Sequence, residues 1–105
     1  MSAKTKEKLV LKINTAAPRV KVFLYSSDGR LISKKEWLSR RDTGGQLLKT
    51  IEIMRKKRQL YFEKLKKIEV YQGEGSYTGI RVGLAVAKTL GFVFKIPVKT
   101  TRSWG

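Results

Sequence analysis

The chain has 105 residues, of which 41% are hydrophobic, and this is enough for one small domain with its own core. It carries 24 Lys and Arg residues against 8 Asp and Glu residues, a formal net charge of +16, so polyanions such as RNA are candidate partners. It contains no cysteine and no histidine, which excludes disulfides and any catalysis or metal binding by these two residue types.

The first eight residues form a polar, lysine-rich lead that we expect to be flexible, followed by a single domain over residues 9–105. No apolar segment of the secretory type follows Met1, and no uncharged run approaches the roughly 20 residues of a membrane span. We therefore expect a cytoplasmic protein that does not enter a membrane.

The first part of the domain predicts three strands. A short apolar run, Leu9–Ile13, is typical of a buried strand, and residues 20–25 alternate in the manner of a strand with one buried face. Asp28-Gly29 is typical of a hairpin turn, because this pair tolerates the positive φ that such turns require. Residues 30–38 would then return as the third strand.

The second part predicts a loop over residues 40–45 and then alternating helices and strands. Leu47 and Ile51 mark the apolar face of the first helix, which residues 60–65 either extend or follow as a separate turn. The expected elements are a helix at 46–57, a strand at 68–71, a helix at 78–94 and a strand at 98–100. Three strands followed by helix, strand, helix and strand predict a mixed α/β sheet covered by helices.

The turn Gly73-Glu74-Gly75-Ser76 leads into a helix with a stripe of small residues. Gly79, Gly83, Ala87 and Gly91 recur at every fourth position, which puts them on one side of the helix. Each glycine costs a helix about 1 kcal/mol relative to alanine, so the stripe predicts a compensating close contact. The contact is with this chain's own sheet or helix, or with a helix of another chain.

The segment Gly73–Gly83, with the apolar helix and Ile96-Pro97-Val98 after it, resembles the signature of the TsaB (YeaZ) family. Members of that family are accessory subunits in bacterial synthesis of the tRNA base threonylcarbamoyladenosine. The family usually reads Gly-Pro-Gly-Ser-Phe-Thr-Gly-Leu-Arg, from which Glu74, Tyr77 and Ile80 depart. The strand Leu9–Ile13 with Asn14-Thr15 matches the family's first strand and its Asp-Thr-Ser, with Asn14 in place of the aspartate. The resemblance covers only the N-terminal half of a typical member.

This resemblance implies a single RNase H-like (actin/ASKHA-type) subdomain, with a mixed five-stranded sheet and two main helices. It also implies a non-catalytic scaffold, without cofactor, that binds a TsaD-like threonylcarbamoyl transferase in synthesis of tRNA N6-threonylcarbamoyladenosine (t6A37). In the family, the two helices form a bundle with the matching helices of TsaD, and without a partner we expect a homodimer through the same surface. The expected partner-binding residues are Gly79, Ile80, Gly83, Leu84, Ala87, Gly91, Leu47 and Ile51.

A small basic RNA-binding protein is the alternative function. Its contact residues would be Arg55, Lys56, Lys57 and Arg58, the densest run of positive charge, and tRNA contact could coexist with docking to a transferase. The aromatic residues that could stack on bases are Tyr25, Tyr61, Phe62, Tyr71 and Tyr77. They do not form the paired aromatic motif of an RNA-recognition sheet.

A vestigial nuclease or ATPase is the remaining alternative. Glu52 and Glu74 could belong to a carboxylate cluster for Mg²⁺, but neutral Asn14 stands where a metal ligand would be needed, so we expect no metal site. The Gly73–Ser76 turn could cradle a phosphate or could cap the helix through Ser76 or Thr78. We favour the cap, because Glu74 would repel a phosphate.

Overall fold

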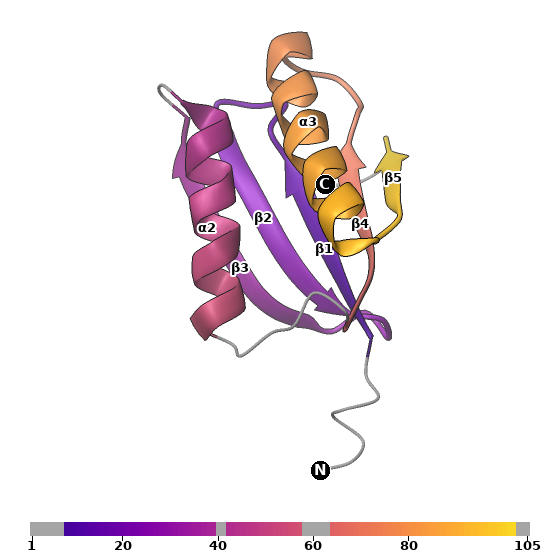
Figure 1. Cartoon of the computed structure of the whole chain (residues 1–105). Helices are drawn as coiled ribbons and strands as arrows, with labels where there is room; N and C mark the ends of the chain where they lie inside the picture. Colours follow the sequence, from indigo (N-terminus) through magenta and orange to yellow (C-terminus); the bar gives the residue numbers. More distant parts are fainter. Residues whose placement is uncertain (1–7, 40–41, 58–63, 103–105) are drawn as a thin grey trace.

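The computed structural model of the chain describes residues 8–39, 42–57 and 64–102 (Figure 1). The described residues form five strands and two helices that pack as two layers. In chain order these are β1 (Leu9–Asn14), β2 (Arg19–Ser26), β3 (Leu31–Leu38), α2 (Thr43–Lys57), β4 (Leu65–Tyr71), α3 (Tyr77–Phe94) and β5 (Val98–Thr101).

The strands form one mixed sheet in the order β3-β2-β1-β4-β5. The β1–β2 and β2–β3 pairs are antiparallel, whereas β1–β4 and β4–β5 are parallel. Parallel neighbours need crossover connections, and α2 and α3 lie in these connections, side by side on the same face of the sheet (Figure 1). The predicted fold class, a mixed five-stranded sheet with two helices, is confirmed.

The core lies between the sheet and the two helices. Alternate strand residues such as Ile13, Val22 and Ile68 are fully buried there, with Leu47 from α2 and Ala87 from α3. Aliphatic residues on one strand face and on one helix stripe are the pattern that brings a sheet and helices together. The predicted elements are all present, although β4 begins at Leu65 and not at Ile68.

The start of α2 differs from the prediction, which placed residues 43–45 in a loop. Asp42 has a left-handed φ of 54°, and its carboxylate accepts a hydrogen bond from the backbone N–H of Gly45 at 3.2 Å. A Cβ at Gly45 would overlap that carboxylate, so glycine leaves room for this interaction at the helix start. The two glycines therefore belong to the first turn of α2.

The ends of α3 are defined by one side chain and one backbone conformation. Ser76 is the N-cap, and its hydroxyl oxygen accepts the N–H of Gly79 at 3.0 Å. At the other end, Lys95 adopts a left-handed φ of 59°, and the N–H of Ile96 donates to the carbonyl of Gly91 at 2.8 Å. The cap predicted for this helix is confirmed, with Ser76 and not Thr78 as the capping residue.

Of the helices in the described ranges, α3 alone is long and apolar enough to cross a membrane, with a mean hydropathy of 1.2. Length and composition are the only basis for this statement, and a single such helix is weak evidence because the core helix of a soluble protein has the same properties. Here α3 packs against the sheet and beside α2.

Several sequence predictions fall outside the described residues. These are residues 1–7 of the expected flexible lead, residues 60–63 of the expected helix extension, the aromatic residues Tyr61 and Phe62, and Arg58 of the basic run.

Candidate functional site

The glycines of the α3 stripe face this chain's own backbone. A Cβ at Gly83 would lie 2.5 Å from Oγ1 of Thr15, and one at Gly91 would lie 2.6 Å from the carbonyl oxygen of Ile96. A Cβ at Gly79 would overlap the carbonyl oxygen of Thr15. The stripe therefore allows α3 to approach the segment after β1 and the segment before β5 more closely than larger residues would.

This placement corrects the expectation that the stripe is open to a partner. Ile80, Ala87, Leu47 and Ile51 are each at most 5% exposed and belong to the core or its border, and Gly83 and Gly91 are buried as well. Among the eight residues expected to bind a partner, Leu84 and Gly79 are half-buried, and Gly79 is in contact with Thr15. The close contact that the spacing predicted is intramolecular.

The Gly73–Ser76 turn and the start of α3 are hydrogen-bonded to the residues that follow β1. The N–H of Ser76 donates to the carbonyl of Ala16 at 2.7 Å, and the Thr15 hydroxyl donates to the carbonyl of Gly79 at 2.5 Å. Gly75 has a φ of 135°, and a Cβ there would lie 2.6 Å from the Ala16 carbonyl oxygen. Ligands of open α/β sheets usually bind at the carboxyl ends of the strands, and here these hydrogen bonds join the segment after β1 to the start of α3.

The residues considered for metal chemistry are not assembled into a site. The Asn14 side-chain oxygen accepts the N–H of Ala16 at 2.9 Å, and Glu52 forms an ion pair with Arg55 at 2.7 Å. The hydrogen bond from Arg55 lowers the pKa of the Glu52 carboxyl. Within the described ranges, no group of three or more His, Cys, Asp or Glu residues could hold a metal ion.

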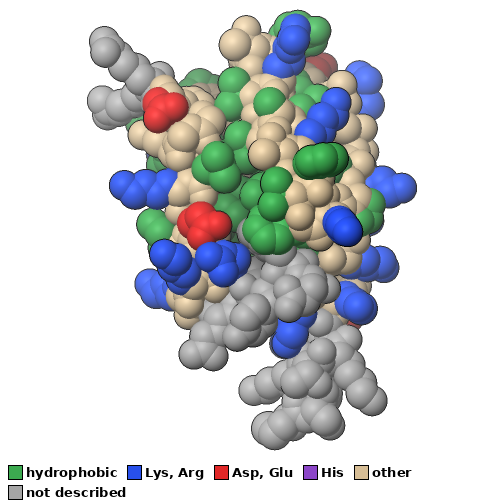
Figure 2. Space-filling view, viewed as in Figure 1, with side chains coloured by type: hydrophobic (Ala, Val, Ile, Leu, Met, Phe, Trp, Pro, Cys, Tyr) green, Lys and Arg blue, Asp and Glu red, His purple; other side chains and the backbone are tan. Residues whose placement is uncertain are grey.

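The outer surface of the helix pair carries large apolar side chains in contact with solvent. Phe92 is 86% exposed, Val93 57% and Leu48 40%. Figure 2 shows apolar side chains over both helices, interspersed with and surrounded by lysine and arginine side chains. Beside them, Arg81, Leu84, Ala85 and Lys88 line a shallow depression of about 240 Å³ on α3. We call the set Leu48, Phe92 and Val93 the helix-pair face.

The sequence prediction missed Phe92, Val93 and Leu48, although one signal could have found Phe92. With 3.6 residues per turn, a residue nine positions after Gly83 lies about 180° around the helix from it. If Gly83 faces the sheet, Phe92 must therefore face away from it.

The basic run at the end of α2 is described only in part. Lys56 and Lys57 are exposed, whereas Arg55 is half-buried and paired with Glu52. Positive charge in the last turn also complements the helix dipole, which gives these residues a structural role.

Comparison with protein families finds a match over more than half of the chain. The model of the TsaD family, described as tRNA N6-adenosine threonylcarbamoyltransferase, matches residues 38–102. The chain belongs to the TsaD family. The match includes α2, β4, α3 and β5, and so covers both helices of the helix-pair face.

Among curated proteins, this TsaD-family chain is similar to the tRNA threonylcarbamoyladenosine biosynthesis protein TsaB of Bacillus subtilis. The two are 49% identical over 39 residues, which are 37% of this chain and 17% of that protein. The similarity to TsaB agrees with the family resemblance that the sequence motifs indicated.

Among solved structures, YeaZ from Pseudomonas aeruginosa is similar over 90% of this chain and 44% of its own, with a TM-score of 0.78 and 21% identity. RuvC from Thermus thermophilus has a TM-score of 0.62 at 12% identity, over 90% of this chain and 63% of its own. A Bacteroides thetaiotaomicron protein with an actin-like ATPase fold has a TM-score of 0.53 at 9% identity. These likenesses show an RNase H-like fold. The chain spans less than half the length of YeaZ.

Proposed function

We propose that this TsaD-family chain is a TsaB-like accessory protein in synthesis of tRNA N6-threonylcarbamoyladenosine, and that it acts by docking a TsaD-like transferase. In this proposal the chain supplies no catalytic group and no cofactor, and the chemistry takes place in the partner. The family match and the similarity to TsaB and YeaZ support the pathway. The proposed role belongs to the cytoplasm, where tRNA is modified.

The observation that carries the docking proposal is the exposed helix-pair face. Large apolar side chains in water are unfavourable, and burying one fully stabilises a complex by about 1.5–3 kcal/mol. Contiguous apolar patches with a polar rim mark interaction surfaces. Phe92, 86% exposed, lies one turn after Lys88 on the outer side of α3, an arrangement that suits a partner helix with apolar and acidic residues.

The buried glycine stripe supports docking indirectly. Because Gly83 and Gly91 hold α3 against the sheet, the outer side of the helix is fixed before a partner arrives. A pre-organised surface loses less conformational entropy on binding than a flexible one. The same face would make a symmetric homodimer when the chain is alone.

The experiment that tests docking removes the apolar side chains and leaves the core intact. In the double variant Phe92→Ser/Val93→Ser, we expect the dissociation constant for the TsaD-like transferase of the same organism to rise about tenfold or more. The unfolding midpoint should change little, because both side chains are exposed. Isothermal titration calorimetry measures the binding, and urea denaturation measures the stability.

The matched control is Leu31→Ser, because Leu31 is 52% exposed on β3, away from the two helices. It should bind as the unchanged chain does. Full affinity in the Phe92→Ser/Val93→Ser variant would contradict the proposed docking surface.

RNA binding is the second candidate function, favoured by the net charge of +16. The exposed lysines Lys56 and Lys57 would contribute to it, together with Arg55 and Arg58. Salt separates the two functions, because RNA affinity falls steeply with ionic strength whereas apolar docking changes little.

A further inference from the structure

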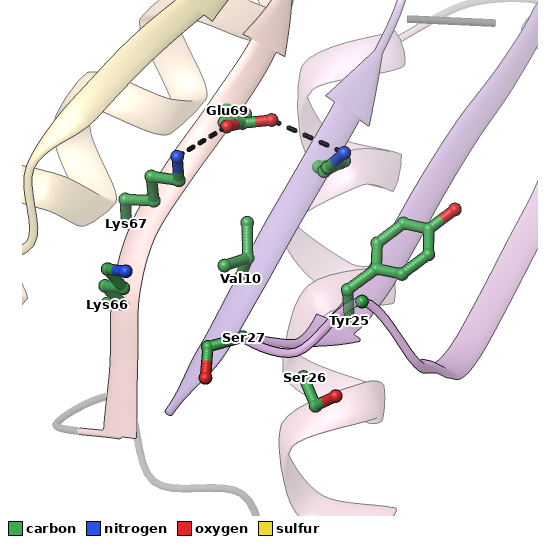
Figure 3. Close-up of a pocket in the computed structure, with 9 residues that line it drawn as sticks. Val10, Tyr25, Ser26, Ser27, Lys66, Lys67 and Glu69 are labelled. Atoms are coloured by element: carbon green, nitrogen blue, oxygen red, sulfur yellow. Dashed lines mark ion pairs between the residues drawn. The ribbon is translucent and has the colours of Figure 1, made fainter. Parts of the chain in front are cut away.

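The sheet has a second face, opposite the helices. In the described part of the chain, no helix or strand covers this face, and Figure 3 views the sheet with the helices behind it. Strand registers identify its side chains, because residues directly opposite one another on paired strands point to the same side.

The registers place a row of charged and aromatic residues across all five strands of this face. Phe23 is opposite Lys34 on one side and Lys12 on the other, Lys12 is opposite Glu69, and Glu69 is opposite Lys99. In the neighbouring rows, Lys21 is opposite Glu36, and Val10 is opposite both Tyr25 and Lys67. The residues Val10, Lys12, Lys21, Phe23, Tyr25, Lys34, Glu36, Lys67, Glu69 and Lys99 are called the open sheet face.

The composition of the open sheet face argues against a second apolar layer. It holds five lysines and two glutamates, whereas the helix-covered side is almost entirely aliphatic. Burying lysine ammonium groups without partners costs much free energy, so antiparallel sheets keep such a face toward water. A positively charged surface of this kind suits an anionic partner.

One end of the open sheet face is hollowed into a pocket of about 320 Å³, at the small end of the range for small-molecule sites. As Figure 3 shows, Val10 lies in the middle, with Lys66 and Lys67 from β4 on one side and Tyr25 from β2 on the other. Lys12 also lines the pocket, and its ammonium group lies 4.9 Å from the centre of the Tyr25 ring. Backbone and hydroxyl groups of the β2–β3 hairpin complete the wall at Ser26, Ser27 and Gly29.

The pocket is positively charged although it contains Glu69. This carboxylate forms ion pairs with Lys67 at 2.8 Å and with Lys12 at 3.6 Å (Figure 3). Burial alone would raise the pKa of Glu69, but the two lysines outweigh it and hold the pKa below its ordinary value, so the group stays ionised at neutral pH. Three lysines against one glutamate leave an excess of positive charge beside an aromatic ring.

We propose that the open sheet face binds single-stranded RNA, with one nucleotide in the pocket that Val10, Tyr25, Lys66 and Lys67 line. The phosphate contacts the ammonium groups of Lys66 and Lys67, and the base lies against Val10 and the Tyr25 ring. Sheets that bind single strands combine aromatic platforms with lysine or arginine for the backbone. A duplex does not suit this surface, because its bases are already paired and stacked. The proposal does not depend on docking to a transferase.

The test compares two double variants that remove the same charge from opposite sides of the molecule. Binding of a fluorescently labelled oligouridylate is followed by anisotropy at about 50 mM and about 200 mM salt. For Lys66→Gln/Lys67→Gln, we expect affinity at low salt to fall about tenfold or more, with a salt slope shallower by about 1.4 because two phosphate contacts are lost. The comparison variant, Lys56→Gln/Lys57→Gln on α2, removes the exposed lysines of the basic run, which is the alternative RNA site. If the open sheet face is the RNA site, this variant should bind within about twofold of the unchanged chain.

Three further variants test the pocket, one by the direction of the change in affinity and two by the need for an aromatic ring. Glu69→Gln removes the one acidic group of the pocket and should tighten RNA binding several-fold, a result that misfolding cannot produce. Tyr25→Leu should lose at least about fivefold in affinity, whereas Tyr25→Phe, which keeps the ring, should not.

Equal losses of RNA affinity in the two lysine double variants would overturn the proposal. It would also be overturned if Glu69→Gln bound RNA no more tightly than the unchanged chain, or if the unchanged chain bound no RNA. The lysine and glutamate variants should all dock the transferase normally, so failure of the RNA proposal is distinguishable from failure of docking.

Discussion

Gly83 illustrates how a residue that destabilises a helix can stabilise a fold. A glycine inside a helix makes the helix less stable by about 1 kcal/mol than an alanine would. At position 83, however, a Cβ would lie 2.5 Å from the Thr15 hydroxyl oxygen and 3.5 Å from the Ile13 side chain. The cost is offset because the missing side chain lets α3 approach β1, where the Thr15 hydroxyl donates to the Gly79 carbonyl. The spacing of the glycines predicted such a contact, but spacing alone does not say which surface makes it.

A substitution at Gly83 should therefore act on folding. We expect Gly83→Leu to lower the free energy of unfolding by about 3 kcal/mol or more, because the larger side chain must displace Thr15 or move the helix. Urea denaturation followed by circular dichroism measures this change. The control Ala85→Leu lies on the exposed side of the same helix and should change stability by less than about 0.5 kcal/mol.

A Gly83→Leu chain that is as stable as the unchanged one but no longer binds the transferase would contradict the intramolecular role. Such a result would show that the glycine stripe is part of the partner-binding surface, as the sequence first indicated.

At the scale of elements, the sequence predicted every strand and helix of the described chain but misjudged where α2 and β4 begin. The β1 segment is a short apolar run, β2 alternates with a period of two residues, and α3 has small residues at every fourth position, so the type of each could be predicted. The start of α2 could not be predicted, because Gly44 and Gly45 are typical of loops and only the contact with Asp42 shows why the helix accepts them. The outward direction of Phe92 likewise depended on knowing which side of α3 meets the sheet.

The capping residue of α3 provides a test at this scale. Ser76→Ala should lower the free energy of unfolding by about 1 kcal/mol, because the N–H of Gly79 loses its acceptor. Ser76→Asp should retain most of the stability, since a carboxylate can accept the same hydrogen bond and favours a helix N-terminus. The measurement is the midpoint of chemical unfolding for each variant.

Thr78→Ala is the control, because Thr78 was the alternative cap and is exposed within the first turn. A larger loss in Thr78→Ala than in Ser76→Ala would show that the cap is assigned to the wrong residue.

The whole molecule presents two surfaces that lie on opposite sides of one sheet. The helix-pair face is apolar and the open sheet face is positively charged, so a protein and an RNA strand could bind at the same time. The order of elements predicted a mixed sheet covered by helices, and the family resemblance implied the RNase H-like fold, which the likeness to YeaZ confirms. The two surfaces could not be predicted, because each depends on registers and helix orientation that join residues far apart in the sequence.

Docking of a TsaD-like transferase on the helix-pair face, through apolar contacts, is the proposed role of the whole molecule. We would co-express the chain with the TsaD-like protein of its own organism and measure the mass of the purified complex by light scattering, at low salt and at about 1 M salt, where charges are screened beyond about 3 Å. If apolar contacts hold the two proteins together, the mass of the complex should be unchanged at high salt. A chain that elutes without the transferase at both salt concentrations, or a complex that dissociates at high salt, would contradict the proposed docking.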